Sequence, residues 1–279
     1  MVEGKLNRDG NRPLRIGLAG LGAVGIPVAE HLDRGIDGLV LSAVAVRDRE
    51  KARRHVEGFA TVPEIVDIDA LAEHADVVVE GLPASLFRSV AEPILKKGGI
   101  FVPASVGALL TNFDLVDLAR AHGGRIIVPT GALLGLDAVR AAAQGTINSI
   151  TMTTRKPPGG LAGAPYLLEH GPSMDSITEP TMVFEGTARE AAAGFPANLN
   201  VAVALSLAGI GPDKTRLQIW ADPTVTRNTH IIDVDSDSAR FHLKIENIPS
   251  DINPRTGRIT GLSVVAALRS LVDPLRVGT

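Results

Sequence analysis

The chain has 279 residues, of which 45% are hydrophobic, enough to build the cores of two domains. Its 28 Lys and Arg against 31 Asp and Glu give a net charge of −3, so we expect no nucleic-acid or membrane partner. The longest apolar run, Val201–Ile210, is far shorter than the ~20 residues that span a bilayer. Cys is absent, which excludes disulfides and a Cys nucleophile and suits a cytoplasmic protein.

In the first half of the chain, short apolar runs alternate with amphipathic stretches. We expect strands at Leu14–Ala19, Val40–Val46, Val77–Glu80, Ile100–Pro103 and Ile126–Val128, and helices at Val24–Leu32, Ser85–Lys97 and Leu115–His122. The strands are apolar throughout, as expected when helices cover both faces of a sheet. Residues 1–131 are therefore predicted to form an α/β domain with a Rossmann-type doubly wound parallel sheet.

The pattern changes after residue 131, and residues 132–254 are predicted to form a second, α+β domain with a mixed or antiparallel sheet. We expect helices at Leu136–Ala143, Ala188–Ala193 and Asn198–Ala208, strands at Ser149–Arg155, Leu217–Trp220 and Phe241–Glu246, and a Pro/Gly-rich connection at Pro157–Pro180. Apolar and polar residues alternate in the last two strands, which indicates one covered face. Residues 255–279, with a helix at Leu262–Leu271, are expected to pack back on the first domain.

A glycine-rich turn, Gly20-Leu21-Gly22-Ala23-Val24-Gly25, directly follows the first strand and opens a helix. The first Gly permits the tight turn, the second lets a pyrophosphate approach, and the third allows close packing of helix on strand. The free N–H groups of the helix start attract phosphate. We therefore predict an NAD or NADP site that includes Gly20, Gly22, Ala23, Val24 and Gly25.

The residues after the second strand leave the choice between the two cofactors open. An acidic residue is expected there to bind the ribose 2′-hydroxyl of NAD. The sequence instead has Arg47 and Asp48. Arg47 suits the 2′-phosphate of NADP and Asp48 suits a bare ribose, while two solvated loop arginines, Arg47 and Arg49, are the alternative without a ligand.

Several segments of the second half carry residues suited to chemistry. They are Pro129-Thr130-Gly131-Ala132, Arg155-Lys156-Pro157-Pro158, Phe195-Pro196-Ala197-Asn198-Leu199-Asn200 and Arg227-Asn228-Thr229-His230. Together with the glycine turn, Ser105–Leu109 and Val183–Ala188, they resemble the L-aspartate dehydrogenase family in order and spacing over about Arg15–Leu271.

The resemblance implies a homodimeric enzyme that converts L-aspartate and NAD(P) to oxaloacetate, ammonia and NAD(P)H by way of iminosuccinate. The active-site His of the family falls on His230, and its nicotinamide-side contacts fall on Ala132 and Asn200. The sequence departs from the family at Thr130, where Ser is expected, and at Arg47, the ribose position.

The residues favour the same chemistry when they are considered alone. Amine oxidation needs a base for the ammonium proton and a group that activates water, and an imidazole with a pKa of ~6.5 can do both. This makes His230 the catalytic candidate. Glu185 and Asp222 are candidates either to position the substrate ammonium or to orient His230. A strand-edge His bonded to backbone is the alternative.

Cations are needed to bind a dicarboxylate substrate, and Arg155, Lys156 and Arg227 are the nearest candidates. Exposed charges at strand ends are the alternative for each of them. Asn200 also suits a helix cap, which is compatible with a cofactor contact.

Other functions stay open beside the oxidation of aspartate. A dehydrogenase or imine reductase for another small amino acid would need the same residues, and a non-catalytic NAD(P)-binding sensor would need only the first domain. No His, Asp and Glu cluster has metal-ligand spacing and no Gly-x-Ser-x-Gly motif occurs, so we expect neither metal-dependent hydrolysis nor serine acyl transfer.

Overall fold

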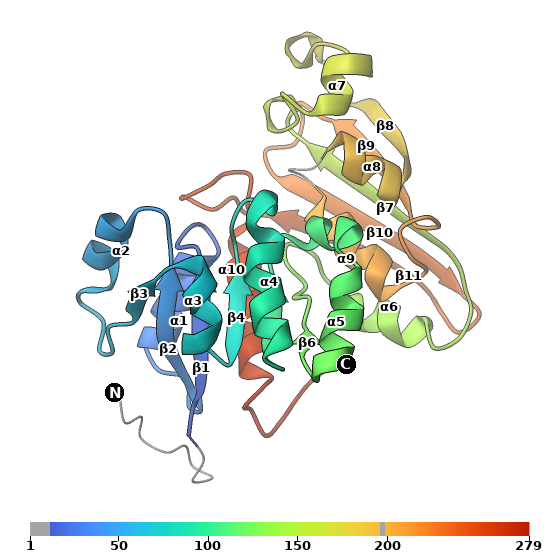
Figure 1. The fold of residues 1–279 in the computed structure, drawn as a ribbon. Helices are drawn as coiled ribbons and strands as arrows, with labels where there is room; N and C mark the ends of the chain where they lie inside the picture. The colour runs from blue at the N-terminus through green and yellow to red at the C-terminus, as the bar shows by residue number, and fades with distance from the viewer. Residues whose placement is uncertain (1–11, 196–198, 279) are drawn as a thin grey trace. The chain divides into compact units, whose positions relative to one another are not determined.

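The structure is a computed structural model that describes residues 12–195 and 199–278. These residues form two compact units (Figure 1). The first consists of residues 12–129 and 260–276, and the second of the described residues within 130–259 and 277–278. The elements of the first unit are β1 (Leu14–Ala19), α1 (Gly25–Asp33), β2 (Leu39–Ala45), α2 (Arg49–Val56), β3 (Glu64–Val66), α3 (Ile68–His74), β4 (Val77–Glu80), α4 (Phe87–Lys96), β5 (Ile100–Pro103), α5 (Asp114–His122), β6 (Arg125–Ile126) and most of α10 (Arg258–Arg269).

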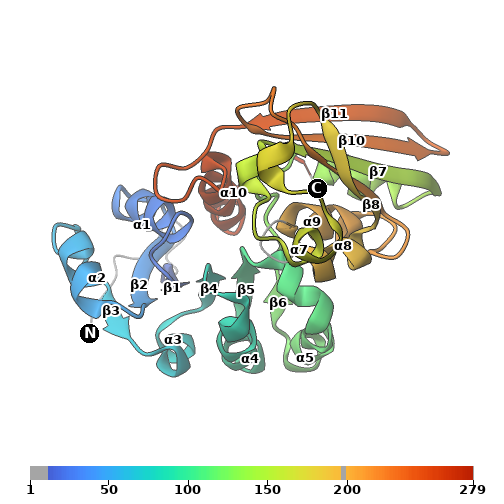
Figure 2. The same cartoon turned by 90° about the horizontal axis from the view of Figure 1, so that it is seen from above.

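The first unit is built on a six-stranded parallel sheet with the order β3-β2-β1-β4-β5-β6. Helices α3, α4 and α5 lie on one face, and α1 and α10 lie on the other (Figure 2). Because both faces are covered, the strands are apolar on both sides, and Val77, Val78 and Val79 of β4 are all buried. The predicted Rossmann-type fold is confirmed.

The second unit is built on a mixed five-stranded sheet with the order β11-β10-β7-β9-β8. Its elements are α6 (Leu136–Ala142), β7 (Ile147–Lys156), α7 (Pro165–His170), β8 (Thr181–Thr187), α8 (Ala188–Gly194), α9 (Asn200–Ala208), β9 (Arg216–Ala221), β10 (Asn228–Ser236) and β11 (Arg240–Asn247). Only β7 and β9 are parallel. Helices α8 and α9 lie on one face (Figure 2), which confirms a second α+β sheet with one helix-covered face.

Some elements differ from the sequence-based prediction. Helix α2 was not predicted, because its sequence is almost entirely polar and lacks the apolar stripe by which an amphipathic helix is recognised. The Pro/Gly-rich connection contains α7, which buries Leu167. Helix α9 begins at Asn200, and residue 198 of the predicted helix lies outside the described residues. In the described part of the chain, no helix is long and apolar enough to cross a membrane.

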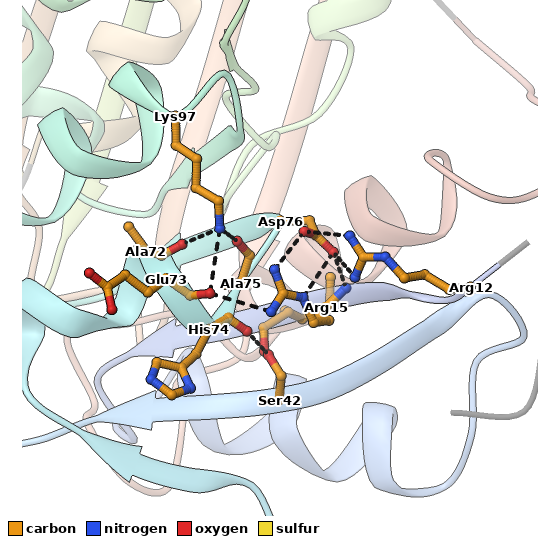
Figure 3. Close-up of polar contacts among 10 residues, drawn as sticks. Arg12, Arg15, Ser42, Ala72, Glu73, His74, Ala75, Asp76 and Lys97 are labelled. Carbon is orange, nitrogen blue, oxygen red and sulfur yellow. Dashed lines mark hydrogen bonds and ion pairs between the residues drawn. The ribbon is translucent and has the colours of Figure 1, made fainter. Parts of the chain in front are cut away.

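An ion-pair cluster at the amino ends of β1 and β4 joins elements that are distant in sequence (Figure 3). Asp76 accepts hydrogen bonds from the backbone and guanidinium of Arg15 and from Arg12, with N···O distances of 3.0–3.3 Å. Burial by itself raises the pKa of Asp76, but these hydrogen bonds outweigh it and hold the pKa at about 2. The carboxylate therefore ties the start of β1 to the start of β4.

The neighbouring end of α3 is held by another cation. Lys97 donates from Nζ to the carbonyl oxygens of Ala72 and Ala75, at 2.7 and 3.2 Å (Figure 3). A helix leaves its last carbonyl groups without partners inside the helix, and a cation there also suits the helix dipole. Lys97 thus replaces the missing intrahelical donors at the end of α3.

Replacement of Asp76 by Asn should lower the unfolding free energy at pH 7 by about 1–3 kcal/mol, because two guanidinium groups lose a charged partner. The folded pKa lies below the unfolded value of about 3.9, so this stabilisation is present above pH 4 and is lost as pH falls towards 2. Thermal melts between pH 2.5 and 7 measure it.

Asp117→Asn is the matched control, because Asp117 is exposed and its ion pair is with Arg120, one helical turn away. A loss for Asp76→Asn that does not depend on pH, or an equal loss for the control, would contradict the prediction.

Candidate active site

The glycine turn borders a pocket of about 680 Å³ in the first unit. The pocket is lined by residues that follow three neighbouring strands, namely Gly20 and Gly22 after β1, Val46–Asp48 after β2, and Gly81 and Leu82 after β4. The carboxyl ends of parallel strands, at the point where the strand order reverses, are where folds of this kind bind dinucleotides. The pocket is therefore a candidate cofactor site.

The three glycines of the turn are needed for different physical reasons. Gly20 has a φ of +105°, which disfavours any side chain. A Cβ on Gly25 would lie 2.0 Å from the carbonyl oxygen of Gly20, so only Gly lets α1 start this close to β1. A Cβ on Gly22 would meet no described protein atom within 4 Å. Protein packing thus leaves Gly22 unexplained, whereas the approach of a phosphate explains it.

The start of α1 also fits a phosphate. Val24 is the N-cap residue of this helix and provides no side-chain hydrogen bond to the first N–H groups. The N–H of Ile26 already donates to the carbonyl oxygen of Gly22 at 3.0 Å and Pro27 has no N–H, so an anion here would be held by the glycine turn before the helix and by the positive end of the helix dipole. Ala23 and Val24 line this turn as half-buried residues, as the predicted cofactor site requires.

A buried carboxylate positions the loops that follow β4 and β5. Glu80 is fully buried and accepts hydrogen bonds from the backbone N–H of Leu82 at 2.8 Å and of Ser105 at 3.1 Å, and from the Ser105 hydroxyl at 3.0 Å. Burial raises the pKa of Glu80, and these hydrogen bonds act in the opposite direction. Leu82 lines the pocket, so its hydrogen bond to Glu80 fixes the backbone of one part of the pocket wall.

In the second unit, His230 lies on the helix-covered face of the sheet and is 3% exposed. It stands opposite Thr154 in the β10–β7 pair, and the Thr154 hydroxyl lies 3.1 Å from Nδ1. Burial, and then the charge of Lys156, lower the pKa of His230 to about 3. The imidazole is therefore neutral at physiological pH, with Nδ1 occupied by Thr154.

Lys156 is the second buried titratable group on this face. It follows Thr154 by two residues on β7, so both side chains point to the same side of the sheet. The residue is 5% exposed, and burial, followed by the charge of Arg255, lowers its pKa to about 8. A buried ammonium that titrates near neutrality is characteristic of functional sites.

The turn at Gly131-Ala132 is attached to the same end of the second sheet. Asn247, the last residue of β11, donates from Nδ2 to the carbonyl oxygen of Ala132 at 3.0 Å. Asn247 pairs with Asn228, two residues before His230, and is 3% exposed. The structure therefore places Ala132 near the strand end that carries His230.

Comparisons with known proteins agree along almost the whole chain. Residues 137–271 match the family described as aspartate dehydrogenase, C-terminal, and residues 20–129 match the NAD binding domain of homoserine dehydrogenase. The chain is 60% identical to the L-aspartate dehydrogenase of Bradyrhizobium diazoefficiens, over 95% of this chain and 94% of that one. It is 52% identical to L-aspartate dehydrogenase 3 of Bordetella bronchiseptica, over 95% and 98% of the two chains.

The chain belongs to the aspartate dehydrogenase family. A crystal structure of aspartate dehydrogenase from Thermotoga maritima shares its fold, with a TM-score of 0.74 and 23% identity over 95% of this chain and 99% of that one. The family resemblance, the enzyme class of NAD(P)-dependent dehydrogenases and the nicotinamide cofactor are thereby confirmed as predictions from the sequence.

Arg155 and Lys156 are neighbours in the sequence and were both candidates for binding the substrate, but the structure places them on opposite faces of the second sheet. Arg155 points to the face opposite Lys156, where it pairs with Asp222 at 3.0 Å and lies 4.8 Å from the Trp220 ring centroid. Asp222 also accepts a hydrogen bond from Thr224, while Nδ1 of His230 is bonded to Thr154, so the orientation of His230 by Asp222 stays a prediction.

The remaining predicted residues occupy exposed positions. Glu185 contacts Gln218 and Arg216 on the uncovered side of the sheet. Arg227 is exposed just before β10. Asn200 is exposed and is the first residue of α9, one position after the N-cap Leu199, so it does not cap the helix in the predicted way.

Sequence reasoning missed Thr154, Asn247 and Glu80 as site residues. Each is a common polar residue, and only its burial and its partner reveal the role. For Glu80 alone the sequence offered a signal. It ends an apolar strand that was predicted to be buried, and a carboxylate is rarely buried unless it has hydrogen-bond or ionic partners. Among the described residues, no three His, Asp or Glu side chains cluster closely enough to hold a metal ion.

The different reasons for the glycines predict different outcomes of substitution. Gly22→Ala should keep the melting temperature but weaken NAD(P)H binding about tenfold or more, because the methyl group would occupy the space of the phosphate. Gly25→Ala should lose both stability and binding, because it collides with the backbone. Calorimetric titration and thermal melts measure the two effects.

Gly58→Ala is the control, because its Cβ would also meet no described atom and the residue lies outside the pocket. Normal cofactor binding by Gly22→Ala would refute the role of Gly22.

Proposed function

We propose that this protein catalyses the NAD(P)-dependent oxidation of L-aspartate, in which aspartate and water yield oxaloacetate, ammonium and a proton while a hydride passes to the cofactor. Support comes from the two relatives named L-aspartate dehydrogenase at 60% and 52% identity. The observation that carries the proposal is the pair of buried titratable groups, His230 and Lys156, on one face of the second sheet. The first unit would hold the cofactor and the second the substrate, in line with the boundaries predicted at residues 131/132 and 255.

A bound NAD(P)⁺ supplies the hydride acceptor, and the protein supplies proton transfer and orientation. Because Thr154 occupies Nδ1 of His230, we assign Nε2 to the substrate side. A neutral imidazole can accept a proton from the substrate ammonium or from the water that attacks the imine. The charge of Lys156 is one cause of the low pKa of His230, so a substrate carboxylate that pairs with Lys156 would raise the basicity of the imidazole.

We assign substrate carboxylate binding to Lys156 in preference to Arg155 and Arg227. Lys156 shares the buried face with His230, whereas Arg155 is paired with Asp222 on the opposite face. A carboxylate beside a buried ammonium regains part of the stabilisation that the ammonium loses by leaving water. Ala132 and Asn200 keep their proposed contacts on the nicotinamide side.

The test of the function is the initial rate of NADH or NADPH oxidation with oxaloacetate and ammonia, beside a panel of other 2-oxo acids. Turnover with oxaloacetate is expected to exceed turnover with every other acid. His230→Ala should lower kcat by 10²–10⁴-fold, the usual range for loss of a general acid–base, and leave NAD(P)H binding unchanged.

His242→Ala is the matched control, because His242 lies exposed on β11 and is bonded to Asp233. Preference for another 2-oxo acid would favour a dehydrogenase or imine reductase for a different small amino acid. Cofactor binding without any turnover would favour an NAD(P) sensor.

The pKa of Lys156 predicts how dicarboxylate binding depends on pH. Succinate does not titrate between pH 6.5 and 9.5, so its inhibition constant should stay level up to about pH 8 and rise above it, as Lys156 loses its charge. His230 should add no change near pH 6.5, because it is already neutral.

Lys156→Met should weaken succinate binding and remove the rise above pH 8, whereas Lys214→Met, an exposed lysine in the same unit, should change neither. A rise near pH 8 that persists in Lys156→Met would assign the titration to another group.

We also propose that the enzyme is a homodimer, as the family resemblance implies. The face of the second sheet that α8 and α9 leave uncovered carries the half-buried Trp220 and Ile231 and the 42% exposed Met182. Pairing of this face with a second copy would remove these apolar side chains from water. Sedimentation equilibrium tests the proposal, and a monomer at micromolar concentration would contradict it.

We place the activity in the cytoplasm. A chain without Cys needs no oxidising compartment, and a small amino acid and a nicotinamide cofactor are both cytoplasmic metabolites. Fractionation of cells that express the protein tests this location.

A further inference from the structure

The cofactor pocket extends from the glycine turn to the residues that follow β2. Ala19 of β1 pairs with Ala45 of β2, so the two strand ends lie side by side, and Arg47 follows Ala45 by two residues. In dinucleotide-binding folds, this end of the second strand meets the ribose of the adenosine half. The side chains around Arg47 therefore decide whether a 2′-hydroxyl or a 2′-phosphate is preferred.

This end of the pocket is strongly cationic. Arg47, Lys51 and Arg54 line it, against one carboxylate, that of Asp48. Within the described part of the chain, none of these three cations takes part in an ion pair. Arg49, by contrast, does not line the pocket and pairs with Asp67 at 2.6 Å. The positive charge is thus concentrated at the pocket, in a chain whose net charge is −3.

The one carboxylate is already engaged. Asp48 is the N-cap residue of α2, and its Oδ1 accepts a hydrogen bond from the backbone N–H of Lys51 at 2.9 Å. An acidic side chain that selects NAD must instead accept a hydrogen bond from the ribose hydroxyl. Capping uses one of the two oxygens of Asp48 and fixes the side chain at the start of α2, and removal of the cap would cost about 1 kcal/mol.

We propose that NADP(H) is the preferred cofactor and that Arg47 is the residue that determines this specificity. This inference rests on the proposed use of a nicotinamide cofactor and names the member of the pair. A 2′-phosphate carries up to two negative charges and accepts forked hydrogen bonds from a guanidinium group. Three cations at one end of a pocket favour it over an uncharged hydroxyl, although solvent and salt screen exposed charges.

The test compares two fragments that differ only in the group concerned, adenosine 2′,5′-bisphosphate and adenosine 5′-monophosphate. Calorimetric titration at low salt should show the wild-type protein binding the bisphosphate at least about tenfold more tightly. Arg47→Gln should reduce this advantage to less than about threefold and leave binding of the monophosphate unchanged. Raising the salt concentration should also reduce the advantage, because the contacts are ionic.

Arg49→Gln is the matched control, since this neighbouring arginine is paired with Asp67 outside the pocket, and it should keep the full advantage. Equal affinity of the wild-type protein for the two fragments would overturn the proposal. So would a variant at Arg47 that weakens both fragments equally while its melting temperature stays normal.

Fragment binding requires no turnover, so it separates this inference from the proposed reaction. A preference for the bisphosphate in a protein that does not convert oxaloacetate would support the cofactor inference and refute the substrate. Turnover of oxaloacetate with kcat/KM for NADH equal to or above that for NADPH would overturn the cofactor inference alone.

Discussion

The close contact between the start of α1 and the end of β1 is the constraint on which the cofactor site depends. Gly25 comes so near the carbonyl oxygen of Gly20 that no other residue fits there. This contact holds the start of α1 against the glycine turn that follows β1, at the border of the pocket. The loop held by Glu80 and the cations after β2 line the same pocket as the glycine turn.

In the second unit the decisive constraint is the alternation of side chains along β7. Neighbouring residues of a strand point to opposite faces, so Arg155 and Lys156 occupy different environments. Arg155 stays half-exposed and paired with Asp222, while Lys156 is buried beside His230. Burial lowers the pKa of both Lys156 and His230, and this reverses the simple expectation that the histidine titrates near neutrality.

Much of the fold was predictable because burial on both faces makes a strand apolar along its whole length. Five strands of the first sheet were located in this way, and the glycine turn was located by its spacing after the first of them. The alternation in β11 indicated a sheet with one covered face. Helix α2, with its polar sequence REKARRHV, and β3, with only three residues, carry too little apolar periodicity to be recognised. The turn that ends at Ala132 was predicted, but the Asn247 side chain that holds it was not.

The sequence by itself determined the fold class, the place of the glycine turn and the identity of His230 as the candidate catalytic group. The first two depend on local patterns, because apolar periodicity and the spacing of glycines are properties of a continuous stretch of chain. His230 was identified by the family resemblance and by the proton transfers that amine oxidation needs. Only the tertiary structure decided that Lys156 is buried on the same face as His230 and that Asp222 forms an ion pair with Arg155. It also decided that Asp48 caps α2 beside three cations. Strand register, burial and the resulting shifts in pKa arise from residues far apart in the chain, and no local pattern encodes them.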